Sequence, residues 1–416
     1  MEKKKILSSW KEISNYLGIR VRTAQRWESE IGLPIHRIEK LNKTYVIAYI
    51  DEIDNWIKNK TQPKSNNKPA VLKYILTVLF TAIVISAAFL IPKSHPTSEI
   101  FSYKIEDTHL VITDKNEKRL WDHYLSPRLN KIEFEEDWPK KNVQFKDIDN
   151  DGKPNVIVAI QNQDNFDEEI VCFDHKGNQL WRRKIGKEIL YGDKTFSSDF
   201  DIARFKLEDL DGDSRDEIAV IACHKIYFPC RFMILNSSGD LIGEYWNAGH
   251  LNTMAFADLN DDRKKEIILG GVNNNYRKAC LAVFDLAEVQ GSSPQIKGTR
   301  YFSPVLGPGS EKYYLLLPQN VVGQTMFIQE NVRSIDLLTN KRFDLTSSIS
   351  RIHFEFDRNM VCTDVYLGDE FILNFNKLKQ EGKLAINLDD IDTEKLRSEI
   401  VYWNEGEWLS KSAIAK

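Results

Sequence analysis

Residues 209–222 read DLDGDSRDEIAVIA, an acidic turn that leads directly into an apolar strand. The same pattern recurs as DIDNDGKPNVIVAI over residues 147–160 and as DLNDDRKKEIILGG over residues 258–271. The three units begin 62 and 49 residues apart, and short alternating runs with Gly, Asn and Asp turns lie between them. A multi-strand module repeated at this spacing indicates a radial β architecture.

A second feature of the repeat lies downstream of each acidic turn. Asp174, Asn236 and Asp285 each follow the first aspartate of their unit by 27 residues. The stretch DHKGNQLW (174–181) also resembles DKNEKRLW (114–121), which has no acidic turn before it. We interpret residues 114–121 as part of an earlier unit. The sequence therefore predicts an all-β propeller with calcium-type loops over residues 92–416, although the repeat fades beyond residue 300.

The acidic turns place oxygen atoms at positions 1, 3, 5 and 9 and a backbone carbonyl at position 7. This spacing can wrap a hard cation, so we expect structural Ca²⁺. Position 6 favours glycine, which only the first loop has, and the third loop carries an arginine there, so its metal site is doubtful. The alternative is acidic turns without metal. The expected ligands are Asp147, Asp149, Asp151, Lys153 and Asn155; Asp209, Asp211, Asp213, Arg215 and Glu217; and Asp258, Asn260, Asp262, Lys264 and Glu266, with the two lysines and Arg215 acting through their carbonyls.

Over about residues 140–290 these loops resemble the FG-GAP/VCBS repeats of integrin-α-type propellers. Because a strand follows each loop where an EF-hand would have a helix, the loops are not EF-hands. The resemblance implies that calcium binds between strands as a structural ion.

Residues 1–60 have a different pattern, typical of a compact helical domain. Ser9 and Glu12 form a capping box that begins a helix, and Gly18 ends it. We expect a second helix from about residue 20 to 30, extended runs at 35–38 and 44–47, and a third helix at 51–58. Residues 61–70 read as a polar linker.

The charge of the chain is divided unevenly. Residues 1–70 carry 14 Lys/Arg and 8 Asp/Glu, a net charge of +6, whereas the remainder carries about −10. This division favours a polyanionic partner for the first part and cations for the second.

The strings WKEISNYLGIRVRTAQRWESEIGLPIHRI (10–38) and YVIAYIDEIDNWI (45–57) resemble the small MerR/excisionase-like winged helix-turn-helix family. The resemblance covers about residues 7–58 and implies a recognition helix after the glycine turn and a basic two-stranded wing. Double-stranded DNA is then the expected partner. The alternative is a helical domain that binds protein. The expected DNA contacts are Arg20, Arg22, Thr23, Gln25, Arg26, Arg37, Lys40 and Lys43.

Tyr74–Ile91 is an uncharged apolar run of 18 residues, which predicts one transmembrane helix within residues 71–91 and contact with the lipid bilayer. More lysines precede the run than follow it, so the positive-inside rule puts the N-terminus in the cytoplasm. The predicted location is a bacterial cytoplasmic membrane, crossed once, with residues 92–416 extracytoplasmic.

The five cysteines all lie after residue 170 and form no CxxC motif. Cys223 and Cys230 can pair in an oxidising compartment, and buried free thiols are equally compatible with the sequence. No HExxH, GxSxG or P-loop motif occurs, so we expect no enzymatic activity and no catalytic residues.

Together these features predict a membrane-tethered one-component transcriptional regulator, a homodimer when active, whose propeller binds an unknown extracytoplasmic ligand or protein. The alternative is an envelope adhesion or assembly module whose first domain anchors it to a cytoplasmic protein. A quinone-dependent propeller enzyme fits less well, because the carboxylate constellations and adjacent cysteines of such enzymes are missing.

Overall fold

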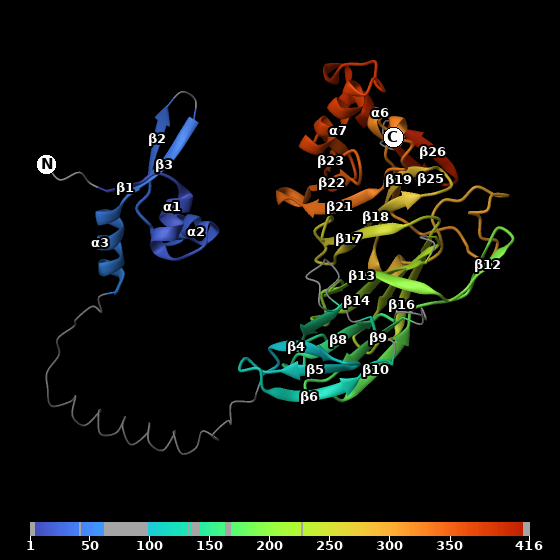
Figure 1. Cartoon of the computed structure of the whole chain (residues 1–416), viewed down its shortest axis with the longest axis horizontal. Helices are drawn as coiled ribbons and strands as arrows, with labels where there is room; N and C mark the ends of the chain where they lie inside the picture. The colour runs from blue at the N-terminus through green and yellow to red at the C-terminus, as the bar shows by residue number, and fades with distance from the viewer. Residues whose placement is uncertain are drawn as a thin grey trace. The chain divides into compact units, whose positions relative to one another are not determined.

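The computed structural model describes residues 5–40, 43–61, 99–127, 129–130, 134, 142–162, 168–225 and 228–410. The chain divides into two compact units, Met1–His95 and Pro96–Lys416 (Figure 1). Each unit has its own hydrophobic core.

The N-terminal unit combines three helices with a three-stranded antiparallel sheet in the order β1-β3-β2. The Ser9 hydroxyl accepts from the backbone N–H of Glu12 and caps the first helix, which Gly18 ends at φ 67°. Gly32 ends the second helix at φ 69° in the same way. The elements are β1 (Ile6–Leu7), α1 (Trp10–Leu17), α2 (Val21–Ile31), β2 (His36–Lys40), β3 (Lys43–Tyr49) and α3 (Ile50–Thr61).

This unit is an α+β fold with an antiparallel sheet, whereas the sequence predicted an α domain of winged helix-turn-helix type. That part of the predicted fold class is wrong. The run of β-branched and aromatic residues at 44–49 favours a full strand, and Ile6–Leu7 adds a third strand to it. The core beneath the sheet contains Ile13, Ala24 and Ile53, each fully buried.

The C-terminal unit is β-rich and propeller-like, because its antiparallel sheets mostly join strands in chain order. The apolar runs after the acidic turns form wholly buried strands. The first three sheets contain β4 (Ser102–Glu106), β5 (His109–Thr113) and β6 (Arg119–Tyr124); β7 (Val143–Lys146), β8 (Asn155–Ile160), β9 (Glu169–Phe173) and β10 (Gln179–Lys184); and β13 (Phe200–Glu208), β14 (Glu217–His224), β15 (Cys230–Leu235) and β16 (Leu241–Asn247).

The remaining sheets are larger or carry additions. The fourth contains β17 (Leu251–Ala257), β18 (Glu266–Asn273), β19 (Lys278–Phe284), β20 (Tyr313–Leu316), β25 (Val401–Asn404) and β26 (Glu407–Ser410), and the fifth contains β21 (Val332–Leu337), β22 (Phe343–Ser347), β23 (Ile352–Phe356) and β24 (Cys362–Leu367). Smaller elements are the hairpin β11 (Ile189–Tyr191)–β12 (Lys194–Phe196), the helices α6 (Val321–Thr325), α7 (Asp369–Gln380) and α8 (Thr393–Ser398), and the 3₁₀ turns η1 (Leu286–Glu288), η2 (Thr339–Lys341) and η3 (Leu388–Asp390).

Consecutive sheets are joined by a tryptophan that packs on the next sheet's glycine turn. Trp121 Nε1 donates to the carbonyl of His175 at 3.1 Å, and Trp181 Nε1 donates to the carbonyl of Ser237 at 2.9 Å. A Cβ on Gly177 or Gly239 would lie 2.7 or 2.5 Å from the respective indole ring. At the next junction Gly243 stands in the tryptophan position, and a Cβ there would lie 2.9 Å from the Cβ of Val289.

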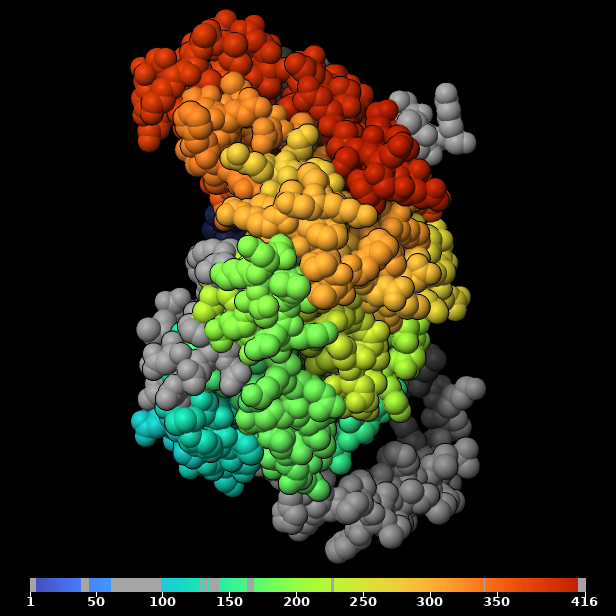
Figure 2. All heavy atoms as spheres, turned by 90° about the vertical axis from the view of Figure 1, so that its right-hand side faces the viewer, coloured from blue at the N-terminus to red at the C-terminus, as the bar shows by residue number. Residues whose placement is uncertain are grey.

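The unit differs in two respects from the all-β propeller that the sequence predicted: the arrangement of its sheets and the presence of a packed helix. The sheets follow one another in chain order from a teal end to a red end, and the first and last sheets lie at opposite ends in both views (Figures 1 and 2). The fifth sheet is also covered by α7, whose buried residues Phe371, Phe375 and Leu378 recur at helical spacing. The part where the repeat fades is therefore mixed α and β.

The predicted transmembrane helix and membrane location require a further correction. Among the described residues, no helix is long and apolar enough to span a membrane. This finding contradicts the predicted single-pass location, and the run at Tyr74–Ile91 on which it depended lies outside the described residues.

The tryptophan–glycine contact can be tested with two alanine variants at matched backbone conformations. A Cβ on Gly239 (φ 78°) would meet Trp181, whereas a Cβ on Gly298 (φ 80°) would have nothing within 4 Å. We expect Gly298→Ala to lower the free energy of unfolding by about 1 kcal/mol, the cost of the positive φ. Gly239→Ala adds a steric clash of about 1–3 kcal/mol. Equal midpoints in urea denaturation of the two variants would show that the Trp181 ring does not pack closely on Gly239.

Candidate functional site

The three acidic turns form loop 1 (residues 147–155), loop 2 (209–217) and loop 3 (258–266), between the first two strands of successive sheets. In loop 2, the backbone N–H groups of Gly212 and Ser214 donate to the two carboxylate oxygens of Asp209, at 2.7 and 3.0 Å. The first aspartates of loops 1 and 3 likewise accept two backbone N–H groups each. Each loop is therefore held in a tight turn by its own first carboxylate.

Positions 6 and 9 have the same role in all three loops. Gly152, Ser214 and Arg263 stand at position 6 with φ values of 84°, 70° and 71°, so the sharp turn is present even without glycine. The side chain at position 9 accepts the backbone N–H of position 2 in each loop, as Glu217 does from Leu210 at 2.9 Å.

Loop 1 brings carboxylate oxygens of Asp147, Asp149 and Asp151 within 4.8 Å of one another. The Oδ1 atom of Asp149 is buried and has no hydrogen-bond partner within the described part of the chain. A buried carboxylate oxygen without a donor is costly, and a bound cation would satisfy it. These residues therefore fit calcium, with the carbonyl of Lys153 and the amide oxygen of Asn155 as the other expected ligands.

Loop 2 gathers Asp209, Asp211 and Glu217 within the same distance, and Asp213 is not part of that cluster. Burial raises the pKa of Glu217 to about 7, and the neighbouring aspartates add to the shift, while the N–H of Leu210 opposes it. The carbonyl of Arg215 would complete the ligand set. A divalent cation here would neutralise carboxylates that otherwise repel one another.

Carboxylates of loop 3 are already paired with two lysines from later parts of the chain. Lys341 Nζ lies 3.5 Å from Asp258 and 2.6 Å from Asp261, and Lys312 Nζ lies 3.0 Å from Glu266. Desolvation raises the pKa of Asp258, but the backbone N–H groups and the Lys341 ammonium together hold that pKa below its usual value. Loop 3 therefore does not form a compact carboxylate cluster like those of loops 1 and 2. The other ligands expected in this loop were Asn260, Asp262 and the Lys264 carbonyl.

The loops also connect neighbouring sheets. The backbone N–H of Asp216 in loop 2 donates to the carbonyl of Ile148 in loop 1 at 3.0 Å. In the same way the backbone N–H of Lys265 in loop 3 donates to the carbonyl of Leu210 in loop 2 at 2.8 Å. An ion that fixes one loop would therefore also stabilise the junction with the next sheet.

In the N-terminal unit, the expected DNA contacts are divided between α2 and the β2–β3 hairpin. Arg22, Gln25 and Arg26 are exposed along α2, Arg20 is its N-cap, and Thr23 is half-buried. The other three expected contacts lie on the hairpin. Arg37 donates two hydrogen bonds to Glu28, at 2.5 and 2.9 Å. Lys40 and Lys43 are paired at the end of the hairpin, and their side chains lie outside the described residues.

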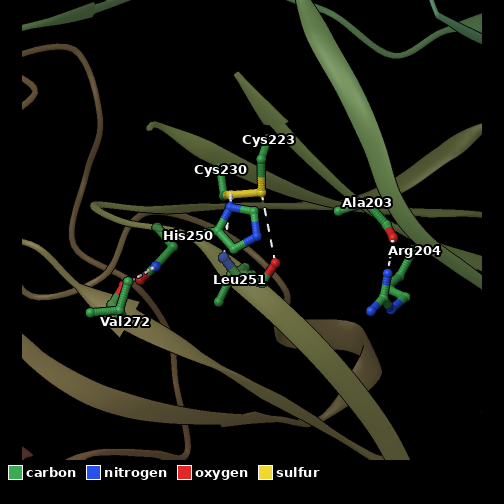
Figure 3. Close-up of a disulfide and its surroundings, with 8 residues drawn as sticks. Ala203, Arg204, Cys223, Cys230, His250, Leu251 and Val272 are labelled. Carbon is green, nitrogen blue, oxygen red and sulfur yellow. Dashed lines mark hydrogen bonds between the residues drawn. A yellow bond between two sulfur atoms is a disulfide. The ribbon is translucent and has the colours of Figure 1, made fainter. Parts of the chain in front are cut away.

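Two features were not predictable from the sequence patterns. Lys341 lies about 80 residues from loop 3, and no motif marks it as the partner of that loop. The cysteine question is decided by register: Cys223 and Cys230 are opposite each other on β14 and β15 and form a disulfide (Figure 3). Cys172, Cys280 and Cys362 are free and buried.

Comparison with known proteins gives little further guidance. No family model and no curated protein matches the chain, so neither resemblance drawn from the sequence gains support. Among solved structures, the rhamnogalacturonan lyase YesW is 15% identical over 53% of this chain and 41% of its own, with a TM-score of 0.32. The Dos1 propeller is 8% identical over 63% and 65%, with a TM-score of 0.32. The V. cholerae biofilm matrix protein Bap1 is 13% identical over 67% and 49%, with a TM-score of 0.21. The chain spans about two fifths of the lyase, and likeness at this level carries no argument about activity.

Calcium should stabilise the chain through loops 1 and 2 but not through loop 3. A ligand that binds only the folded state adds about 2.7 kcal/mol at a hundredfold excess over its dissociation constant. We expect thermal melts to show a higher Tm with calcium than with EDTA. Asp149→Asn should reduce this difference, whereas Asp262→Asn in loop 3 should leave it unchanged. Identical melts in calcium and EDTA would contradict calcium binding.

The calcium effect should also depend on pH. Glu217 has a folded pKa of about 7 against an ordinary value of 4.5, so below pH 7 the calcium-free loop retains a proton that calcium must displace. We therefore expect the calcium-induced rise in Tm to be larger at pH 8 than at pH 5.5. Without calcium, the same group destabilises the fold as pH rises from 4.5 to about 7, because the unfolded chain releases this proton first. Glu217→Gln should remove both dependences, and an unchanged pH profile in that variant would contradict this assignment.

Proposed function

We propose that the chain is a one-component DNA-binding regulator, with a DNA-binding N-terminal unit and a C-terminal unit that is stabilised by calcium and binds the signal. The observation that carries the proposal is the exposed row Arg22, Gln25 and Arg26 on α2. Their spacing puts them on one face of the helix, away from the buried Ala24.

Charge along α2 is polarised. Arg20 and Arg22 stand at its N-terminal end, whereas its acidic residues Glu28 and Glu30 are near the C-terminal end, where Arg26 Nε lies 3.5 Å from Glu30. The helix dipole adds positive potential at the same N-terminal end. Both effects favour entry of α2 into the major groove with its N-terminal half nearest the bases, where arginine pairs with guanine and glutamine with adenine.

The hairpin contributes less charge than the sequence indicated. Arg37 is held by Glu28, so its guanidinium is neutralised within the unit. Lys40 and Lys43 are then the hairpin cations that would contact phosphates, and Thr23 at the start of α2 has a hydroxyl suited to the same contact. A homodimer would place two copies of α2 on half-sites about 34 Å apart.

A second candidate function is protein binding by the N-terminal unit. Ile38 and Tyr45 are directly paired across β2 and β3, and they are 48% and 50% exposed. An exposed apolar pair on a hairpin favours a protein partner more than DNA.

Binding of the full chain to duplex DNA tests both candidates. We expect salt-sensitive binding in fluorescence anisotropy, with a preferred duplex selected from a random pool. On that duplex Arg22→Ala or Gln25→Ala should cost about 1–3 kcal/mol and much less on unrelated DNA. Lys11→Ala, which changes an exposed lysine of α1, is the matched control and should have a small effect. Failure to bind any duplex at low ionic strength would reject the DNA proposal and favour the protein-binding candidate.

A further inference from the structure

A cavity in the C-terminal unit lies far along the chain from the acidic loops. The hairpin β11–β12 and the segment near residue 300 lie side by side on the face shown in Figure 2, in green and orange. Gly192 N–H donates to the carbonyl of Phe302 at 2.7 Å, and the Ser303 hydroxyl donates to the carbonyl of Leu190 at 2.6 Å. Between them is a cavity of about 330 Å³, which is within the usual range for small-ligand sites.

Four aromatic rings form the wall of this cavity. Phe228 packs edge-to-face against Tyr191, Phe196 and Tyr301, with ring centroids 4.9, 5.3 and 5.0 Å away. Tyr191 is wholly buried, and its hydroxyl has no hydrogen-bond partner among the described residues. Such a wall suits the flat face of a ring, and the unpaired hydroxyl leaves one polar interaction for a ligand to supply.

Two cations stand on the rim. Lys194 Nζ lies 4.7 Å from the centre of the Phe196 ring, and the Arg300 guanidinium lies 4.7 Å from the centre of the Tyr301 ring. Neither cation has a salt bridge within the described part of the chain, although Arg300 Nη2 donates to the Tyr301 hydroxyl at 2.5 Å, and Asp193 is the one acidic residue that lines the cavity. Because the chain's own cations already cover two rings, a cationic ligand is disfavoured and an anion is favoured.

We propose that this cavity binds a small ring-bearing carboxylate. Its carboxylate pairs with Lys194 and Arg300, and its ring lies on the aromatic wall. An aromatic acid and a sugar acid share this chemistry. The site goes beyond the proposed DNA binding and does not depend on it, since all of its residues belong to the C-terminal unit.

Ligand-detected NMR on the full chain tests the proposal with benzoate and glucuronate as probes. Benzyl alcohol and glucose are the neutral counterparts. We expect at least one acid to bind more tightly than its neutral counterpart. The acid that binds shows whether the ring of the ligand is aromatic or a sugar. Arg300→Gln should weaken that binding about three- to tenfold, because a charged partner is lost at an exposed rim.

Lys297→Gln is the matched control. It removes the same charge from an exposed residue of the same segment that does not line the cavity, and binding should be unchanged. Absence of binding by both acids up to about 10 mM would overturn the proposal. Equal binding of acid and neutral counterpart, or equal weakening by the two variants, would overturn it as well. None of these results depends on whether the chain binds DNA.

Discussion

The contact between one sheet's tryptophan and the next sheet's glycine turn sets the geometry of the C-terminal unit. Trp121 and Trp181 each pack an indole ring where a Cβ would otherwise lie, and each also donates a hydrogen bond to a carbonyl of that turn. The hydrogen bond fixes the direction of the ring, and the ring fixes the distance between the sheets. At the next junction Gly243 takes the place of the tryptophan, so this position supplies neither an indole ring nor an indole hydrogen bond there.

The acidic loops add a second connection between the same sheets, and the chain compensates their charge in two ways. Loops 1 and 2 concentrate carboxylates that repel one another. In the first, Asp149 Oδ1 is buried with no hydrogen-bond partner among the residues that the structure describes, and in the second the pKa of Glu217 is raised. Loop 3 has the same backbone turn but receives ammonium groups from Lys312 and Lys341. The turn is thus a property of the local sequence, whereas its need for an external cation depends on what the neighbouring sheets supply.

This difference explains which parts of the structure were predictable from the sequence. The repeat and the buried strands are local, so spacing and composition predicted them, whereas the left-handed Ser214 and Arg263 at position 6 were not expected from residue type. The pairing of Lys341 with loop 3, of Glu28 with Arg37, and of Ile6–Leu7 with β3 joins segments that are distant in sequence or have weak patterns. Helix α7 was not predicted, because its phenylalanines at helical spacing follow a long region of strand-like alternation.

The pairing of Arg37 with Glu28 has a consequence for how the N-terminal unit can meet DNA. By sequence alone, the hairpin and α2 are comparably basic. In the fold, the Arg37–Glu28 pair removes one charge from each sign and does so at the C-terminal half of α2, close to the hairpin. Arg26 in turn lies 3.5 Å from Glu30, so what remains is a gradient, positive at Arg20 and Arg22 and nearly neutral beyond them. A phosphate backbone is attracted most strongly to a positive end, so under the proposed function the gradient would orient the unit on a duplex as well as attract it. Glu28 thus lowers the net charge of the unit, but its pairing with Arg37 leaves the positive charge concentrated at one end of α2, from which DNA would approach.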